Sequence, residues 1–284
     1  GQVVNAGDGA ILAGFTADVA FDVTDNANAV AAEVTGSNGA GDLDEVNTLI
    51  VSGGDVDTSE AGAIQAISGY DCSASDYEIT DNAAAVIGAG PSVIENDGVT
   101  RVEVTNDATA LVGVALNSYS ANVDIDVSDT VASISSVLTT TTALQTTIPA
   151  PGQNGPGMGM LRMSTPINTN GFITNLDDAN SVVVSSGVAD VNQAINIQGI
   201  AGYDGSESDY DITDSAANLI SAGDHILNVT GVDVVTVNDG ATSANDGAIL
   251  AGFTADVAFD VTDNANAVAA EVTGSNGAGD LDEV

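Results

Sequence analysis

The chain has 284 residues, and its 41 Asp and Glu stand against only 2 basic residues, for a formal net charge of −39. This charge excludes nucleic acid as a partner and excludes binding to anionic membranes through a basic patch, because both would be repelled. No apolar run is long enough to predict membrane insertion. The acidity predicts that cations screen the repulsion within the chain, supplied either by calcium or by a high salt concentration.

The segment from Asp8 to Val46 recurs without a difference from Asp246 to Val284. The identity extends to solvent-facing positions, which the packing of a core does not constrain. Two interpretations remain open. Either the protein is finite and contains two copies of one module, or the sequence is part of a longer tandem array whose period is the interval from Asp8 to Asp246. We favour the array, which predicts that Asn47 and the residues after it follow Val284.

Short strands that end in a small polar residue and an acid recur along the chain, and an Ala-rich stretch follows each one. The acids follow one another at similar intervals, except for one much longer gap between Asp129 and Asp190. One strand in each period of about 25 residues is typical of a solenoid. The anchoring acids are Asp25, Asp81, Asp107, Asp129, Asp214, Asp239 and Asp263, with looser members at Asp55 and Asp190.

The Ala-rich stretches favour short helices, and we place Asp81 and Asp214 at their N-caps. Each helix has only two or three turns, so stacking on the next repeat must hold it. The sequence therefore predicts an α/β solenoid-like repeat with short parallel strands and short Ala-rich helices. An all-β solenoid is the alternative, because Ala, Val and Thr together form helices only marginally well.

Alternation along the strands separates an inward apolar face from an outward polar one. Acids in register on the outward face, at a strand spacing of about 4.8 Å, would repel by roughly 0.9 kcal/mol for each pair even in water. Either cations or a partner occupy this ladder, or it is a solvated face that discourages edge pairing. The inward residues are Phe21, Val23, Tyr77, Ile79, Val102, Val104, Ile125, Val127, Tyr210, Ile212, Val235, Val237, Phe259 and Val261.

The motifs VTDNANAV, ITDNAAAVI, VSDTVASI and ITDSAANLI resemble the V/I-S/T-D-T-A-A-N-I/L repeats of large bacterial and cyanobacterial extracellular repeat proteins. In that family these repeats often accompany haemolysin-type calcium-binding repeats. The resemblance covers most of the chain outside residues 130–180. It implies an extracellular or cell-surface location and brings no catalytic residues with it.

Residues 130–180 interrupt the repeat pattern and divide the chain into repeats at 1–129 and 181–284. A threonine run is followed by a segment rich in Pro, Gly and Met between Pro149 and Pro166, and this density of Pro and Gly cannot continue a repeat. The segment is either a surface loop, an O-glycosylated stalk, or an arm that carries a Met-rich patch and Arg162 to a neighbouring subunit.

Two loops, at residues 69–76 and 202–209, closely match each other and place oxygen-bearing side chains at alternate positions. This spacing can surround a hard cation, so calcium is the candidate cofactor. A turn closed by Asp and Ser side chains is the alternative. The candidate ligands are Asp71, Ser73, Ser75, Asp76, Asp204, Ser206, Ser208 and Asp209, with Asp42, Asp44, Asp280 and Asp282 in the duplicated acidic turn.

Catalysis has little support in the sequence. His225 is the only histidine, and Cys72 has no basic neighbour that would lower its pKa. We therefore expect a non-enzymatic extracellular structural protein that self-assembles from identical subunits into a filament, sheath or surface layer. The alternative is a calcium-dependent adhesin or a carbohydrate-binding surface module with glycans as partners, and a hydrolase on a parallel β-helix ranks third.

Overall fold

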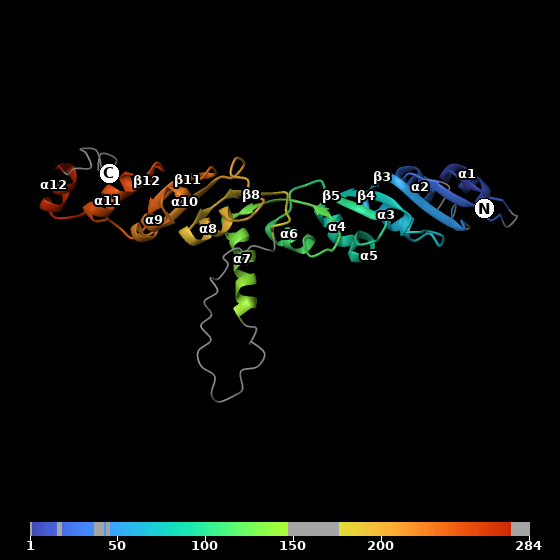
Figure 1. The fold of residues 1–284 in the computed structure, drawn as a ribbon, viewed down its shortest axis with the longest axis horizontal. Helices are drawn as coiled ribbons and strands as arrows, with labels where there is room; N and C mark the ends of the chain where they lie inside the picture. The colour runs from blue at the N-terminus through green and yellow to red at the C-terminus, as the bar shows by residue number, and fades with distance from the viewer. Residues whose placement is uncertain (1, 16–18, 37–42, 44–45, 147–175, 274–284) are drawn as a thin grey trace, which may run out of the picture. The chain divides into compact units, whose positions relative to one another are not determined.

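The structure is a computed structural model that describes the chain except for residues 1, 16–18, 37–42, 44–45, 147–175 and 274–284 (Figure 1). Its contacts divide the chain into two compact units. Unit 1 comprises residues 1–108 and 112–126, and unit 2 comprises residues 109–111 and 127–284. Within each unit parallel strands alternate with short helices, so the predicted α/β class is confirmed over the all-β alternative.

Unit 1 contains one sheet whose strand order is the chain order, and each strand runs parallel to the one before it. Parallel neighbours need a crossover connection, and short helices provide it. The strands are β1 (Val3–Val4), β2 (Asp22–Asp25), β3 (Thr48–Val56), β4 (Asp76–Asp81), β5 (Val99–Val104) and β6 (Val123–Asp124). The helices are α1 (Ala6–Ala13), α2 (Ala27–Thr35), α3 (Thr58–Gln65), α4 (Ala83–Ala89), α5 (Pro91–Ile94) and α6 (Ala110–Leu116), the last of which begins in unit 2.

Unit 2 repeats this construction around a four-stranded parallel sheet of order β12-β11-β10-β9, with β7 and β8 as a separate pair. The strands are β7 (Asp126–Thr130), β8 (Ser181–Ser186), β9 (Val188–Ala189), β10 (Tyr210–Asp214), β11 (Val232–Val237) and β12 (Val257–Ala258). The helices are α7 (Val131–Thr146), α8 (Val191–Gln198), α9 (Ala216–Ala222), α10 (Asp224–Leu227), α11 (Ala244–Ala251) and α12 (Ala265–Thr273).

The core lies between the sheet and the helices and is built from small and β-branched side chains. The predicted inward residues are buried, except that Val237 and Val261 stay partly exposed. Packing is close: a Cβ added to Gly9 of α1 would lie 2.8 Å from a methyl group of Val23. Each fully buried Val or Ile stabilises the fold by about 1.5–3 kcal/mol, which compensates for the low aromatic content.

Asp81 and Asp214 do not cap the helices that follow them, so their predicted N-cap assignment is wrong. The N-cap of α4 is Asn82, whose Oδ1 accepts from Ala85 N–H at 3.1 Å, and the N-cap of α9 is Ser215. Asp81 instead accepts from Thr58 N–H at 3.1 Å, at the first residue of α3. The acid therefore completes the helix of the preceding βα segment, meaning a strand with the helix or helices that follow it.

We call this contact the strand-end cap, and it recurs in both units. In the segment that ends in Asn106-Asp107, the acceptor is Asn106 rather than the predicted Asp107. Of the two looser anchors, Asp190 is the ordinary N-cap of the helix α8 that follows it, whereas the N-cap of α3 is Asp57 and not Asp55. The other strand-end caps join Asp25 to Ala6 at 3.0 Å, Asp129 to Ala110 at 3.0 Å, Asp214 to Val191 at 3.0 Å, Asp239 to Ala216 at 3.2 Å and Asp263 to Ala244 at 3.2 Å.

The register of the sheet differs from the predicted ladder of acids. Glu78 lies opposite Arg101 rather than Glu103, and Asp22 lies opposite Thr48. Acids still meet where Glu103 lies opposite Asp124. The prediction placed the matching motifs of neighbouring strands side by side, whereas irregularities in the pairing of β3 with β4 and of β4 with β5 shift the strands.

The predicted interruption at residues 130–180 contains the described helix α7, and β8 is the next described strand after it. The Pro/Gly/Met-rich segment at 149–166, with Arg162, lies outside the described residues. No helix within the described ranges combines the length and apolar character needed to cross a membrane.

Candidate functional site

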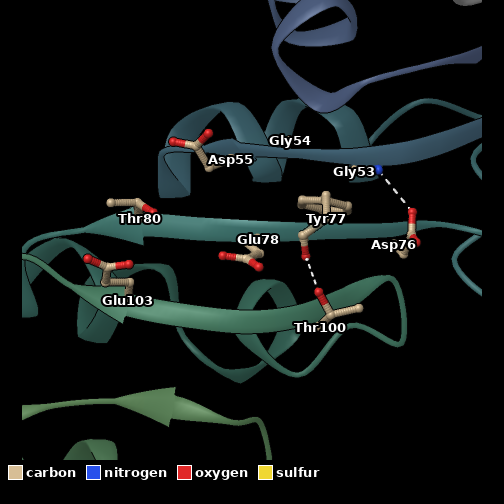
Figure 2. Close-up of a pocket in the computed structure, with 9 residues that line it drawn as sticks. All are labelled: Gly53, Gly54, Asp55, Asp76, Tyr77, Glu78, Thr80, Thr100 and Glu103. Carbon is tan, nitrogen blue, oxygen red and sulfur yellow. Dashed lines mark hydrogen bonds between the residues drawn. The ribbon is translucent and has the colours of Figure 1, made fainter.

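The outward face of unit 1 contains a groove of about 590 Å³ across β3, β4 and β5 (Figure 2). It arises where Gly53 and Gly54 take positive φ values of 74° and 92° and shift the register of β3. These values favour glycine over any other residue. The Gly53 N–H donates to Asp76 Oδ1 at 2.9 Å, which fixes one end of the groove. The lining residues are Gly53, Gly54, Asp55, Asp76, Tyr77, Glu78, Thr80, Thr100 and Glu103.

Carboxylates and hydroxyls dominate the groove. Asp55 lies opposite Glu78 in the register of β3 and β4, and Thr80 lies opposite Glu103 in that of β4 and β5. The Thr100 hydroxyl is already engaged, because it donates to the carbonyl oxygen of Tyr77 at 3.1 Å. Four acids along one groove attract cations and repel anionic ligands.

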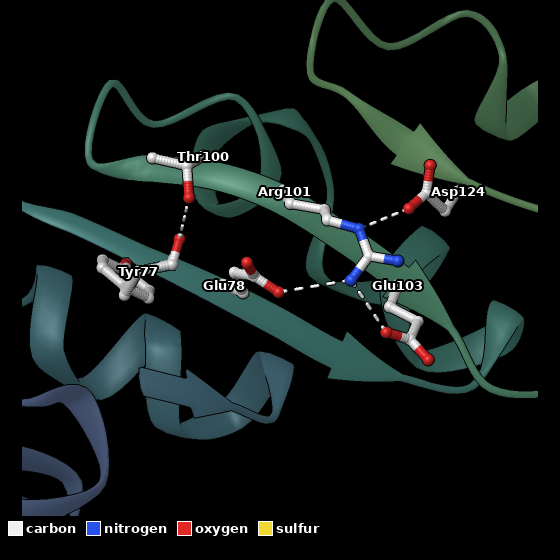
Figure 3. A network of polar contacts seen from close by, with 6 residues as sticks. All are labelled: Tyr77, Glu78, Thr100, Arg101, Glu103 and Asp124. Carbon is white, nitrogen blue, oxygen red and sulfur yellow. Dashed lines mark hydrogen bonds and ion pairs between the residues drawn. The ribbon is translucent and has the colours of Figure 1, made fainter. Parts of the chain in front are cut away.

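Arg101 sits beside this groove and partly neutralises it (Figure 3). Its guanidinium contacts Glu78 at 3.3 Å and Glu103 at 3.0 Å, and its Nε donates to Asp124. These charge-assisted bonds, the one to Asp124 above all, raise the pKa of Arg101 further above its ordinary value. A single cation thus bridges β4, β5 and β6 where their carboxylates would otherwise repel one another.

The first of the two matched loops forms a turn closed by side chains. Asp71 Oδ1 accepts from the Ser73 N–H at 3.1 Å and from its hydroxyl at 2.7 Å. Ser75 donates its hydroxyl to the Asp71 carbonyl oxygen at 2.7 Å and accepts from Val51 N–H at 3.0 Å. The loop is thereby attached to β3, and the bonds from Ser73 lower the pKa of Asp71.

The second loop repeats these contacts in unit 2. Asp204 Oδ1 accepts from the Ser206 N–H at 2.9 Å and from its hydroxyl at 2.6 Å, which lowers the pKa of Asp204. Ser208 donates to the Asp204 carbonyl oxygen at 2.7 Å and accepts from Val184 N–H. In each loop, the first Asp and the first Ser predicted as ligands therefore form an Asx turn, and the second Ser bonds backbone groups.

The calcium assignment stays a prediction. Asp76 bonds Gly53, as described above, and the Asp209 N–H donates to the carbonyl oxygen of Val184. Within the described residues, no group of three or more His, Cys, Asp or Glu side chains is placed to hold a metal ion. Asp42, Asp44, Asp280 and Asp282 lie outside the described residues.

Two pairs, each of a buried Tyr and a partly buried Gln, were not predicted from the sequence. Gln65 donates to the Tyr77 hydroxyl at 2.7 Å and to the Val93 carbonyl oxygen at 3.0 Å. Gln198 makes the same contacts with Tyr210 at 2.8 Å and with Ile226 at 3.0 Å. Burial raises the pKa of both tyrosines, so the phenols stay neutral. The two pairs are separated along the chain by the same interval as the two matched loops, and this shared interval was the signal that could have revealed them.

Comparison of the chain with protein-family models, with curated proteins and with solved structures gave no significant match.

Proposed function

We propose that this chain is a non-enzymatic structural repeat protein that self-assembles outside the cell into a filament, sheath or surface layer. The observation that carries the proposal is the strand-end cap. Each cap uses a side chain of one βα segment to complete the helix of the segment before it. A contact of this kind joins each segment to the one before it and can be repeated any number of times, as in a solenoid.

The charge distribution supports an assembly that depends on cations. The chain has a net charge of −39, and Arg101 is the only basic side chain, other than His225, among the described residues. Copies brought together would repel one another, and the screening length falls from about 10 Å at 0.1 M salt to about 3 Å at 1 M. Assembly should therefore require calcium or high ionic strength.

Electron microscopy of negatively stained protein, combined with sedimentation, tests the proposal. The chain is compared in low salt, in high NaCl, in CaCl₂ and in MgCl₂ at matched ionic strength. We expect extended assemblies once the charge is screened. A response to CaCl₂ that MgCl₂ does not reproduce would identify calcium as a specific ligand. Discrete compact monomers under every condition would refute the proposal.

A calcium-dependent adhesin or carbohydrate-binding surface module is the second candidate. The groove across β3 to β5 favours it, because carboxylates and hydroxyls of the kind that line it, such as Asp55 and Thr80, can bind sugar hydroxyls. Binding of glycans by a chain that does not polymerise, with loss of binding in Asp55→Ala, would favour this function over the structural one.

A further inference from the structure

Asn228 begins the sequence Asn228-Val229-Thr230, which is the one place in the chain where Asn is followed two residues later by Ser or Thr. This pattern is the acceptor sequence for N-linked glycans when the middle residue is not Pro. Many chains contain the pattern by chance, so only its surroundings in the fold can indicate a site. A glycan needs an Asn on a surface turn whose side chain the fold does not use.

The turn between α10 and β11 meets these requirements. It covers residues 228–231 and is closed by the Val232 N–H, which donates to the carbonyl oxygen of Val229 at 3.0 Å. The Tyr203 hydroxyl donates to the carbonyl oxygen of Thr230 at 3.0 Å and also holds the turn. Asn228 and Thr230 are both exposed, and no group among the described residues bonds the Asn228 carboxamide or the Thr230 hydroxyl. Both side chains are therefore accessible to a transferase.

The matched turn in unit 1 uses the same position for a different purpose. Glu95 is the counterpart of Asn228 at the interval that separates the two matched loops, and its carboxylate accepts from the Ser120 N–H at 2.6 Å. In unit 2 the link to the next segment is made by Asp224 instead, which accepts from the Thr254 N–H at 2.8 Å. The fold therefore uses this side chain in unit 1, whereas in unit 2 Asn228 is free to carry a modification.

A glycan on Asn228 is also compatible with the strand-end caps. The strands of unit 2 run parallel, so the turns that precede them lie at one edge of the sheet and the caps that follow them lie at the other. Asn228 precedes β11 and Asp239 follows it, and a strand of 6 residues separates its two ends by about 16 Å. The cap that joins Asp239 to Ala216 can therefore form whether or not Asn228 is modified.

We propose that Asn228 is an N-glycosylation site, with a lipid-linked oligosaccharide phosphate as the donor. This inference rests on the proposed function, because N-linked glycans belong to exported chains. In the transfer, Nδ2 of Asn228 forms a bond to the anomeric carbon of the first sugar, and the bond from that carbon to the phosphate oxygen of the lipid breaks. The leaving lipid phosphate keeps the electron pair, and a proton of Nδ2 passes to a base of the transferase.

Peptide mass spectrometry of the chain from the cells that make it tests the proposal. The cells are fractionated first, so that chain recovered outside the cell is analysed separately from chain inside it. We expect the peptide from the exported chain to carry a sugar mass on Asn228. Asn228→Gln and Thr230→Ala should each lose this mass completely and migrate faster on a gel, because one displaces the acceptor nitrogen and the other removes the hydroxyl that the transferase recognises.

Two variants serve as matched controls. Thr230→Ser keeps a hydroxyl at the same position and should keep the glycan. Asn192→Gln removes another exposed Asn, which is followed by Gln193 and Ala194 and so is no acceptor, and it should also keep the glycan. Circular dichroism should give the same spectrum and the same unfolding temperature for all four variants, because none of these side chains has a hydrogen bond within the described residues.

Three results overturn the inference, and they separate it from the proposed function. If the exported chain carries no sugar on Asn228, the site is refuted and the structural function stands. If the sugar mass persists in Asn228→Gln, it lies on another residue, and the structural function again stands. If the chain is confined to the cytoplasm, the proposed function fails and this inference fails with it.

Discussion

Replacing Asp81 tests the strand-end cap most directly. Asp81 accepts from the Thr58 N–H at 3.1 Å and from the Thr58 hydroxyl at 2.7 Å, and it also accepts from the N-cap residue Asn82. Asp81→Ala removes all of these acceptors. Asp81→Asn keeps a neutral acceptor, and Asn106 provides a natural precedent because it accepts from Ala83 N–H at 2.9 Å.

The expected cost follows from the number and kind of bonds lost. Hydrogen bonds to a charged group contribute about 1.5–3 kcal/mol each, and loss of a helix cap costs about 1 kcal/mol. Water can replace part of the contact at this partly exposed site. We therefore expect Asp81→Ala to lower the local free energy of opening by about 2 kcal/mol and Asp81→Asn by about 1 kcal/mol.

Hydrogen exchange is the suitable assay, because a chain of two units need not unfold in one step. A loss of about 2 kcal/mol should speed the exchange of the α3 amides roughly thirtyfold in Asp81→Ala. Two further variants form a matched pair. Asn106→Ala should speed exchange in α4, whereas Asp107→Ala should not, although Asp107 is the acid that the motif suggests.

Two outcomes would refute this reasoning. Unchanged exchange in α3 of Asp81→Ala would mean that the cap adds nothing to stability. Equal effects of Asn106→Ala and Asp107→Ala would mean that charge near the strand end matters and that the specific hydrogen bond does not.

Three further predictions concern the pH dependence of stability, Arg101 and the two glutamines that bond the buried tyrosines. Burial alone would raise the pKa of Asp81, but hydrogen bonds from Thr58 and Asn82 outweigh this effect and lower the pKa. The free energy of unfolding in urea should therefore be higher for the native chain than for Asp81→Asn above about pH 4. This difference should vanish as the pH falls through the lowered pKa. Arg101→Met should destabilise unit 1 slightly, with a smaller loss in high salt, because the freed carboxylates repel one another and salt screens this repulsion. An effect that grows with salt would contradict this. Gln65→Leu and Gln198→Leu should each cost about 1–3 kcal/mol in thermal unfolding, because a buried tyrosine hydroxyl and a carbonyl oxygen lose their donor; a neutral result in both would show that the amides are dispensable.

Much of the fold could be predicted from the spacing of short motifs. The strand alternation identified Tyr77 and Ile79 as core residues, and the Ala-rich stretches identified α4 and α9. The strand-end caps could not be predicted, because the Asp lies 23 residues after the first residue of α3 or α8 that it completes, and the Asn or Ser next to it fits the same local N-cap pattern. Sequence preference alone does not distinguish these two acceptors.

The site was less accessible to prediction than the fold. The groove depends on the register shift that Gly53 and Gly54 produce, and placing the matching strand motifs side by side hid that shift. The same alignment placed Glu78 beside Glu103 and missed the role of Arg101. Alternating oxygens in the loops suggested a cation, yet the same hydroxyls also satisfy backbone groups, which composition cannot reveal.

The strand-end cap also has a consequence for synthesis on the ribosome. The acceptor that completes α3 lies in Asp81, 23 residues after the first residue of that helix, so the start of α3 leaves the exit tunnel before its strand-end cap can form. A helix of this kind therefore gains its last capping bond only after the next strand has emerged. A stalled or cleaved chain would have one incomplete segment at its C-terminal end, while the segments before it would already be locked.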